Sequence, residues 1–173
     1  MNIIVVDEND TEIGVKERDA VDRDNDIYRV SCLWLFNSHG EILLAQRAFD
    51  KRHDPGMWGP AVAGPIEEGE TYESNIVKET EEEIGVAGLS ITKGGKVFRD
   101  GKRRHFTQRF FAITDSDIAD FQPDPREVHS IRWWKREEFE DALRKHPEDF
   151  LPSLKKEGAL DAIWEWFDHK RAY

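Results

Sequence analysis

The chain of 173 residues is poor in cysteine and in long apolar runs. Its one cysteine, Cys32, excludes an internal disulfide and a cysteine zinc cluster. No apolar stretch approaches the roughly 20 residues that span a bilayer. The start, MNIIVVDEND, lacks the basic and apolar segments of a signal peptide. We therefore expect a cytoplasmic protein that does not insert into a membrane.

Positive charge is also in short supply. Lys and Arg number 25 against 36 Asp and Glu, so the net charge is -11. The electrostatic field of this net charge opposes general binding to the nucleic-acid backbone. Small anionic substrates can bind only where the local charge is positive. The length is typical of one domain, so we expect residues 1–173 to form a single domain.

Short apolar or alternating segments between turn residues predict strands at residues 3–6, 11–15, 29–36, 41–46, 90–99, 103–114 and 128–134. Helical patterns cover residues 71–84, 136–145 and 151–170. A loop rich in Pro and Gly separates the fourth strand from the first helix, at residues 51–65. This order predicts a mixed α/β domain with helices packed on a central sheet.

Three carboxylates share one face of the predicted helix 71–84. At about 100° per residue, Glu82 and Glu83 lie about -60° and +40° from Glu79. The face expected to pack on the sheet contains Ile76, Val77, Thr80 and Ile84. Neighbouring carboxylates repel each other unless a cation such as Mg²⁺ neutralises them. If the glutamates stood alone, a solvated acidic face would be the better explanation, because charge runs are common on exposed helices.

Residues 64–86, GPIEEGETYESNIVKETEEEIGV, resemble the signature of the Nudix hydrolase family. The resemblance implies a Nudix-type α/β/α sandwich with a mixed central sheet. It also implies a bound Mg²⁺ or Mn²⁺, with the backbone carbonyl of Gly64 and the carboxylates of Glu79, Glu82 and Glu83 as ligands. These glutamates are then candidate catalytic residues as well.

The resemblance implies roles for residues around the signature. Glu70 and Lys78 are expected to orient the ligands from behind. Lys78 departs from the usual arginine, and Thr80 departs from the usual large aliphatic residue. Lysine keeps the charge but loses the planar fork that would hold Glu70 through two hydrogen bonds. In the family, one of the signature glutamates or one on a downstream loop activates the attacking water. Glu127, just before the strand at 128–134, is the best downstream candidate.

The segment WLFNSHGEILLAQRAFDKRHDPGMW, residues 34–58, is similar to type I isopentenyl-diphosphate isomerases, which share the Nudix fold. In those enzymes the positions of Arg47 and Lys51 hold a diphosphate, so we assign both residues to substrate binding. A second basic group, residues 102–105, is interpreted as a surface patch.

Isomerisation requires a cysteine acid/base, metal-bound histidines and a further glutamate. Ala63 fills the cysteine position and Pro65 fills the following histidine position. The earlier histidines of that family fall near Val21 and Tyr28, which cannot bind a metal through nitrogen. The scaffold is therefore similar to the isomerases, but the residues that remain support hydrolysis.

We accordingly expect a divalent-metal-dependent hydrolase that cleaves a diphosphate linkage in a nucleoside diphosphate derivative or a related small diphosphate. One alternative is an isopentenyl-diphosphate delta-isomerase. The other is a catalytically weak Nudix fold that acts as a nucleotide-binding module. The expected partner is a small-molecule diphosphate substrate, with no membrane and no general nucleic-acid binding, and a homodimer is left open. The sequence also leaves open the substrate and the general base.

Overall fold

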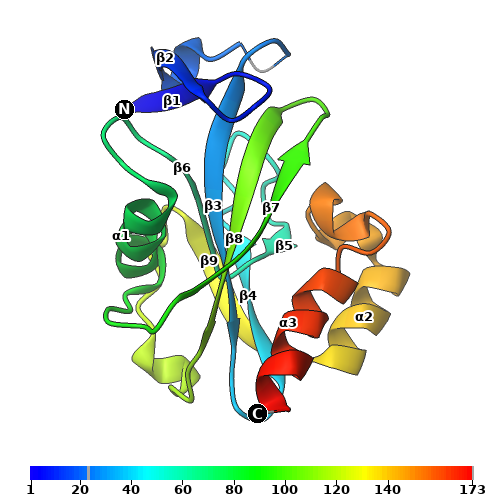
Figure 1. The fold of residues 1–173 in the computed structure, drawn as a ribbon. Coiled ribbons are helices and arrows are strands. Elements are labelled where there is room, and N and C mark those ends of the chain that lie inside the picture. Colours follow the sequence, from blue (N-terminus) through cyan, green and yellow to red (C-terminus); the bar gives the residue numbers. More distant parts are fainter. Residues whose placement is uncertain (23, 173) are drawn as a thin grey trace.

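The computed structural model of the protein describes residues 1–22 and 24–172. Nine strands form one sheet, and helices cover both of its faces (Figure 1). The strands are β1 (Asn2–Val6), β2 (Glu12–Glu17), β3 (Ile27–Phe36), β4 (Glu41–Arg47), β5 (Trp58–Gly59), β6 (Val62–Pro65), β7 (Thr92–Arg99), β8 (Arg104–Ile113) and β9 (Val128–Lys135). The α-helices are α1 (Tyr72–Ile84), α2 (Arg136–Lys145) and α3 (Asp161–Arg171). Four 3₁₀ turns complete the elements: η1 (Arg18–Ala20), η2 (Ile118–Asp120), η3 (Pro147–Asp149) and η4 (Pro152–Lys155).

Helix α1 lies on one side of the sheet, and α2 and α3 lie together on the other side (Figure 1). The sheet is mixed, because β3 pairs in parallel with β8 while the remaining pairs are antiparallel. The predicted α/β/α layering with a mixed central sheet is confirmed.

Strand β3 is the centre of the sheet. It pairs with β8 along its whole length, from Ile27 opposite Arg104 to Phe36 opposite Ile113. Its other edge pairs in turn with β1, β6 and β4. This arrangement places β6 beside the middle of β3, with Gly64 opposite Ser31. Strand β4 then continues outward by pairing with β9.

Alternation along β3 divides its side chains between two cores, because successive strand residues point to opposite faces. Leu33 and Leu35 pack toward α1 with Ile76 and Ile84. The core on the other face contains Cys32, Trp34, Phe36, Phe139, Trp164 and Phe167. The continuous apolar run of β3 is therefore buried on both faces.

Helix α1 begins and ends at signals present in the sequence. The Thr71 hydroxyl accepts a hydrogen bond from the Ser74 N–H (3.1 Å), and the Ser74 hydroxyl accepts one from the Thr71 N–H (2.9 Å). Gly85 ends the helix in the left-handed conformation, with φ 71°, and its N–H donates to the Glu81 carbonyl at 3.1 Å. The predicted helix at 71–84 is confirmed.

The structure corrects three expectations. The single helix expected at 151–170 is wrong, because η4 and α3 are separate and Gly158 between them has a φ of 71°. The loop expected at 51–65 contains the strands β5 and β6. Val77 is 47% exposed, because the buried stripe of α1 is centred on Ile76 and Thr80 rather than one residue further round the helix.

Cys32 is buried in β3, and burial raises the pKa of its thiol to about 12. The thiol is therefore protonated at neutral pH. No helix within the described ranges has both the length and the apolar character needed to cross a membrane.

Candidate active site

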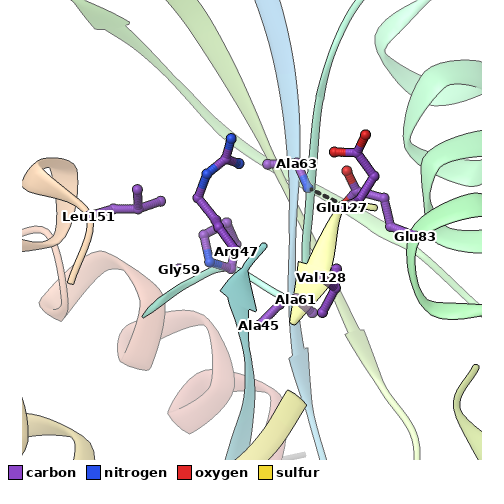
Figure 2. A pocket seen from close by; sticks show the side chains of 10 residues that line it. Ala45, Arg47, Gly59, Ala61, Ala63, Glu83, Glu127, Val128 and Leu151 are labelled. Atoms are coloured by element: carbon purple, nitrogen blue, oxygen red, sulfur yellow. Dashed lines mark hydrogen bonds between the residues drawn. The ribbon is translucent and has the colours of Figure 1, made fainter. Parts of the chain in front are cut away.

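Segments that are far apart in the sequence meet around a small, open hollow of about 30 Å³ (Figure 2). Arg47 ends β4, Ala63 lies on β6, Glu83 is on the last turn of α1, and Glu127 precedes β9. Glu83 and Glu127 lie on one side of the hollow and Leu151 on the opposite side, with Arg47 between them (Figure 2). The Ala48 N–H donates to the Glu127 carbonyl at 3.0 Å, which fixes the Glu127 segment to the end of β4.

Gly64 and Glu79 are in direct contact. A Cβ atom at position 64 would lie 2.4 Å from the Glu79 Cδ and 2.5 Å from its Oε1. Only glycine therefore leaves room for the Glu79 carboxylate, which is 8% exposed. Burial, followed by the charge of Glu82, raises the pKa of Glu79 to about 7, against the lowering effect of Lys78.

Glu83 lies one turn further along α1. Its Oε2 accepts a hydrogen bond from the Ala63 N–H at 3.2 Å (Figure 2). Burial raises the pKa of Glu83 to about 8, and the negative charges of Glu79 and Glu127 add to the effect. The groups around Glu79 and Glu83 therefore do not fully stabilise the negative charge of either carboxylate when it is ionised.

Behind these carboxylates, Lys78 joins acidic side chains of α1 and of the turn before it. Its Nζ lies 2.5 Å from Glu67 Oε1 and 2.6 Å from Glu70 Oε1, and 3.8 Å from Glu79 Oε1. These carboxylates raise the pKa of Lys78, although burial acts in the opposite direction. Glu70 also accepts a hydrogen bond from the Glu67 N–H at 2.9 Å. Lys78 and Glu70 are thus in contact with each other and Lys78 lies beside Glu79, while their role in orienting the ligands stays a prediction.

Of the two predicted diphosphate-binding residues, Arg47 lines the hollow, and Lys51 lies beside Glu127. Arg47 Nε donates to the His53 carbonyl at 3.2 Å. Lys51 Nζ lies 2.5 Å from Glu127 Oε2. The predicted substrate-binding lysine and the predicted downstream glutamate are therefore ion-paired with each other.

Glu82 is exposed, whereas Glu79 is buried and Glu83 is partly buried. Within residues 1–22 and 24–172, no three His, Cys, Asp or Glu side chains converge closely enough to hold a metal ion. The donor set still fits a divalent cation, since Glu79 and Glu83 are oxygen donors that repel each other and lie beside Gly64. The assignment of Gly64, Glu79, Glu82 and Glu83 as metal ligands remains a prediction.

Sequence reasoning missed Asn75 and Ser31, which tie α1 to the sheet behind the glutamates. The Ser31 hydroxyl donates to Asn75 Oδ1, and the Asn75 amide donates to the Pro65 carbonyl (3.0 Å) and to Glu70 Oε2 (2.8 Å). Asn75 is fully buried. A polar residue one turn before Glu79, on the buried side of the helix, was the signal that could have identified it.

The interpretation of residues 102–105 as a surface patch is wrong for His105, which lines a cavity. Its neighbours Arg103 and Arg104 pair with Asp54 and Asp100, but the His105 ring stacks on Tyr28 at 5.3 Å between centroids. The alternation of β8 turns His105 toward the α3 face of the sheet, together with Thr107 and Arg109.

Comparison with known proteins places this geometry in a family. The NUDIX domain model matches residues 27–154. Isopentenyl-diphosphate Delta-isomerase 1 of Aromatoleum aromaticum is 31% identical over 136 residues, which cover 76% of this chain and 75% of that protein. An uncharacterized Nudix hydrolase of Pseudomonas aeruginosa is 32% identical over 128 residues, covering 73% of this chain and 76% of its own length.

Solved structures show the same fold. The crystal structure of DR0079 from Deinococcus radiodurans superposes with a TM-score of 0.81 at 22% identity, covering 94% of this chain and 99% of that one. Because the domain model spans most of the chain and includes the α1 glutamates, this chain belongs to the Nudix family.

Proposed function

We propose that the protein hydrolyses a diphosphate linkage in a nucleoside diphosphate derivative or a related small diphosphate, with Mg²⁺ or Mn²⁺ as cofactor. Membership of the Nudix family supports diphosphate chemistry in general. The observation that carries the proposal is the pair of neighbouring, largely buried carboxylates of Glu79 and Glu83, whose pKa values are raised by burial and by nearby negative charge. Such a pair is suited to a divalent cation.

Glu79, Glu82 and Glu83 would hold the cation, with the backbone of Gly64 beside them. When bound, it would neutralise the diphosphate oxygens and lower the pKa of the attacking water. Arg47 supplies a fixed positive charge at the edge of the same hollow.

Proton transfer falls to the carboxylates of the hollow. A carboxylate oxygen of Glu83 or Glu127 accepts the proton of water as the water oxygen bonds to phosphorus. The bond from phosphorus to the bridging oxygen breaks, and that oxygen leaves with the electron pair. Lys51 has three donor hydrogens, so it can contact Glu127 and a phosphate oxygen together.

The first rival function is isopentenyl-diphosphate isomerisation, which the names of several curated relatives favour. Two positions in the hollow count against it. At position 63 the chain offers a methyl group, and the N–H of that residue already donates to Glu83. At position 65 it offers a proline, which has no titratable atom.

The second rival is a nucleotide-binding module without catalysis. The lack of three converged metal-binding side chains in the described ranges favours it. The raised pKa values of Glu79 and Glu83 count against it, because a site that only binds an anion gains nothing from buried carboxylates.

The test is release of phosphate or nucleotide from a panel of nucleoside diphosphate derivatives and small diphosphates, with Mg²⁺, with Mn²⁺ and with a chelator. We expect release only with metal. Glu83→Gln should slow it by about tenfold or more without lowering the melting temperature, because the amide keeps the shape and removes the repulsion. Glu81→Gln, on the exposed side of α1, is the matched control. Equal rates in the two variants would overturn the assignment, and binding without release would favour the module.

A further inference from the structure

A second cavity, of about 120 Å³, lies on the face of the sheet that α3 covers. Val30, Leu154 and Ile163 contribute to its apolar wall, and Arg99, His105 and Arg109 contribute to its polar wall. The cavity is thus apolar at the helices and basic at β7 and β8.

This cavity adjoins the hollow beside Glu83. Pro60, Ala63 and Leu151 line both. Ala63 contributes only a methyl group to this shared lining. A ligand whose diphosphate lies beside Glu83 can therefore extend past Ala63 toward the basic wall.

The basic wall brings two guanidinium groups to one place. Arg99 on β7 is opposite His105 on β8, and Arg109 follows four residues later on the same face of β8. Both arginines are partly buried. Burial lowers the pKa of Arg99, and the positive charge of Arg109 lowers it further. The two cations therefore repel each other inside a partly dry site.

No acidic side chain in the described part of the chain lies within ion-pair distance of either guanidinium, and the charge that acts on Arg99 at neutral pH is that of Arg109. The adjacent arginines differ, since Arg103 pairs with Asp54 and Arg104 pairs with Asp100. Two neighbouring cations without an acidic partner are stabilised when an anion lies between them.

We propose that Arg99 and Arg109 bind a phosphate group at the end of the substrate remote from the diphosphate that is cleaved. The inference rests on the proposed function and narrows its substrate class to small diphosphates that carry a second phosphate. Two planar guanidinium groups can each offer paired N–H donors to the oxygens of one phosphate. The apolar wall would cover the body of the molecule between its two anionic ends.

His105 fits this arrangement as a neutral group. Its Nδ1 lies 3.0 Å from the Arg103 carbonyl, so Nδ1 carries the proton and donates it. Burial lowers the pKa of His105 to about 4, so the ring adds no third positive charge at neutral pH. Its Nε2 is then an acceptor, suited to a hydroxyl group of the ligand.

The first experiment measures anion binding without catalysis, with inorganic phosphate as the probe. The indole N–H resonance of Trp34, which lines the cavity, is followed by NMR as phosphate is added. We expect a saturable shift in the wild type. It should need about tenfold or more phosphate in Arg99→Gln and in Arg109→Gln. Arg144→Gln, an exposed arginine on α2, is the matched control. Arg47→Gln should leave the Trp34 shift unchanged, because Arg47 lies in the other hollow.

The second experiment compares adenosine 5′-diphosphate with the same compound carrying an additional 3′-phosphate. We expect kcat/KM in the wild type to favour the additional phosphate by about tenfold or more. The preference should disappear in the Arg99→Gln/Arg109→Gln double variant and persist in Arg144→Gln. Melting curves accompany both experiments, and removing one of two repelling cations should not lower the melting temperature. Arg109→Lys, which keeps the charge but not the paired donors, replaces any variant that fails to fold.

An unchanged Trp34 titration in both single variants would overturn the proposal. A lost titration with an unchanged substrate preference would overturn it as well, since the site would then bind free phosphate rather than the substrate. If no diphosphate is cleaved by the wild type while the titration behaves as expected, the proposed function fails and the anion site of Arg99 and Arg109 stands.

Discussion

At the scale of single residues, the contact between Gly64 and Glu79 makes a sharp prediction. The Gly64→Ala methyl group would displace the Glu79 side chain, because its Cβ would lie 2.4 Å from Glu79 Cδ. The atoms it meets belong to a flexible side chain, so the fold should lose only about 1–2 kcal/mol. Diphosphate hydrolysis should fall by about tenfold or more, because the carboxylate leaves its place. Steady-state kinetics and denaturant unfolding measure the two effects.

A double variant isolates the cause of that loss. If Gly64→Ala acts through Glu79, it should add little to the defect of Glu79→Ala, and the two effects should be strongly non-additive. Gly101→Ala is the control, since a Cβ at Gly101 meets nothing within 4 Å. Additive losses in the double variant would contradict the contact as the reason for glycine.

His105 makes the stability of the protein depend on pH. Burial lowers its folded-state pKa to about 4 from an ordinary value of 6.5. The unfolded chain therefore binds more protons between these values, and stability falls as the pH is lowered from 6.5 to 4. The positive charges of Arg103, Arg99 and Lys156 act in the same direction. The ring of Tyr28 stacks on His105.

The prediction for His105→Gln is a flatter dependence of the free energy of unfolding on pH. Between pH 6.5 and pH 4 the free energy of unfolding of the wild type should fall by on the order of 1–3 kcal/mol more than that of His105→Gln. Urea unfolding at several pH values measures it, with His39→Gln on the exposed β3–β4 turn as the control. Parallel curves for the wild type and His105→Gln would show that the ring is not held neutral by the fold.

At the scale of elements, the C-terminus of α1 is joined to the segment that leads to Glu127. The Gln122 N–H donates to the Ile84 carbonyl (2.9 Å), and the Asp124 N–H donates to the Glu83 carbonyl (3.0 Å). A Cβ at Gly85 would lie 2.7 Å from Gln122 Cβ and 3.0 Å from the Gln122 carbonyl oxygen. The helix end and the segment can therefore approach each other only through a glycine.

Gly85→Ala should destabilise the protein by about 2–4 kcal/mol, from its left-handed backbone together with the clash. Gly88→Ala is a matched control, because Gly88 has a φ of 74° but no atom within 4 Å of its would-be Cβ. That variant should lose only about 1 kcal/mol. Thermal and denaturant unfolding give the comparison. Equal losses in the two variants would mean that the backbone strain alone matters and the contact with Gln122 does not.

Elements with strong local signals could be predicted from the sequence. Helix α1 is one, because its cap residues Thr71 and Gly85 and its buried stripe are local features. Strands β5 and β6 could not be predicted in the Pro- and Gly-rich loop, since they exist through pairing with β4 and β3. The C-terminal helical pattern was read as continuous because periodicity alone does not mark the break at Gly158.

At the scale of the whole molecule, the site depends on pairings that no local pattern contains. The signature predicted carboxylates that share helix α1, and Glu79 and Glu83 lie close enough for the charge of Glu79 to raise the pKa of Glu83. The proximity of Glu127 to Lys51 depends on β9 pairing with β4. The cavity with Arg99 and Arg109 depends on β8 pairing in parallel with β3, across a separation in sequence of more than seventy residues. Long-range pairing of this kind follows from tertiary packing rather than from sequence periodicity.

The chain is similar in sequence to isopentenyl-diphosphate isomerases, but it lacks an acid/base side chain that isomerisation requires. Interconversion of isopentenyl and dimethylallyl diphosphate adds a proton at one carbon and removes one from another, so it requires two positioned acid/base groups. Ala63 carries no titratable atom. The cavity beyond it is lined by Arg99 and Arg109, which suit an anion better than a hydrocarbon chain.

We therefore expect that the protein does not interconvert these two diphosphates. Ala63→Cys alone should also be inactive, because Pro65 still occupies the position of a metal-bound histidine and His105 is held neutral against the Arg103 carbonyl. The measurement is incubation of isopentenyl diphosphate in deuterated water with Mg²⁺, followed by mass spectrometry of the recovered diphosphate. A type I isomerase run in parallel is the positive control. Deuterium in the allylic product from the unmodified protein would show that the protein is an isomerase, since hydrolysis at phosphorus exchanges no hydrogen on carbon.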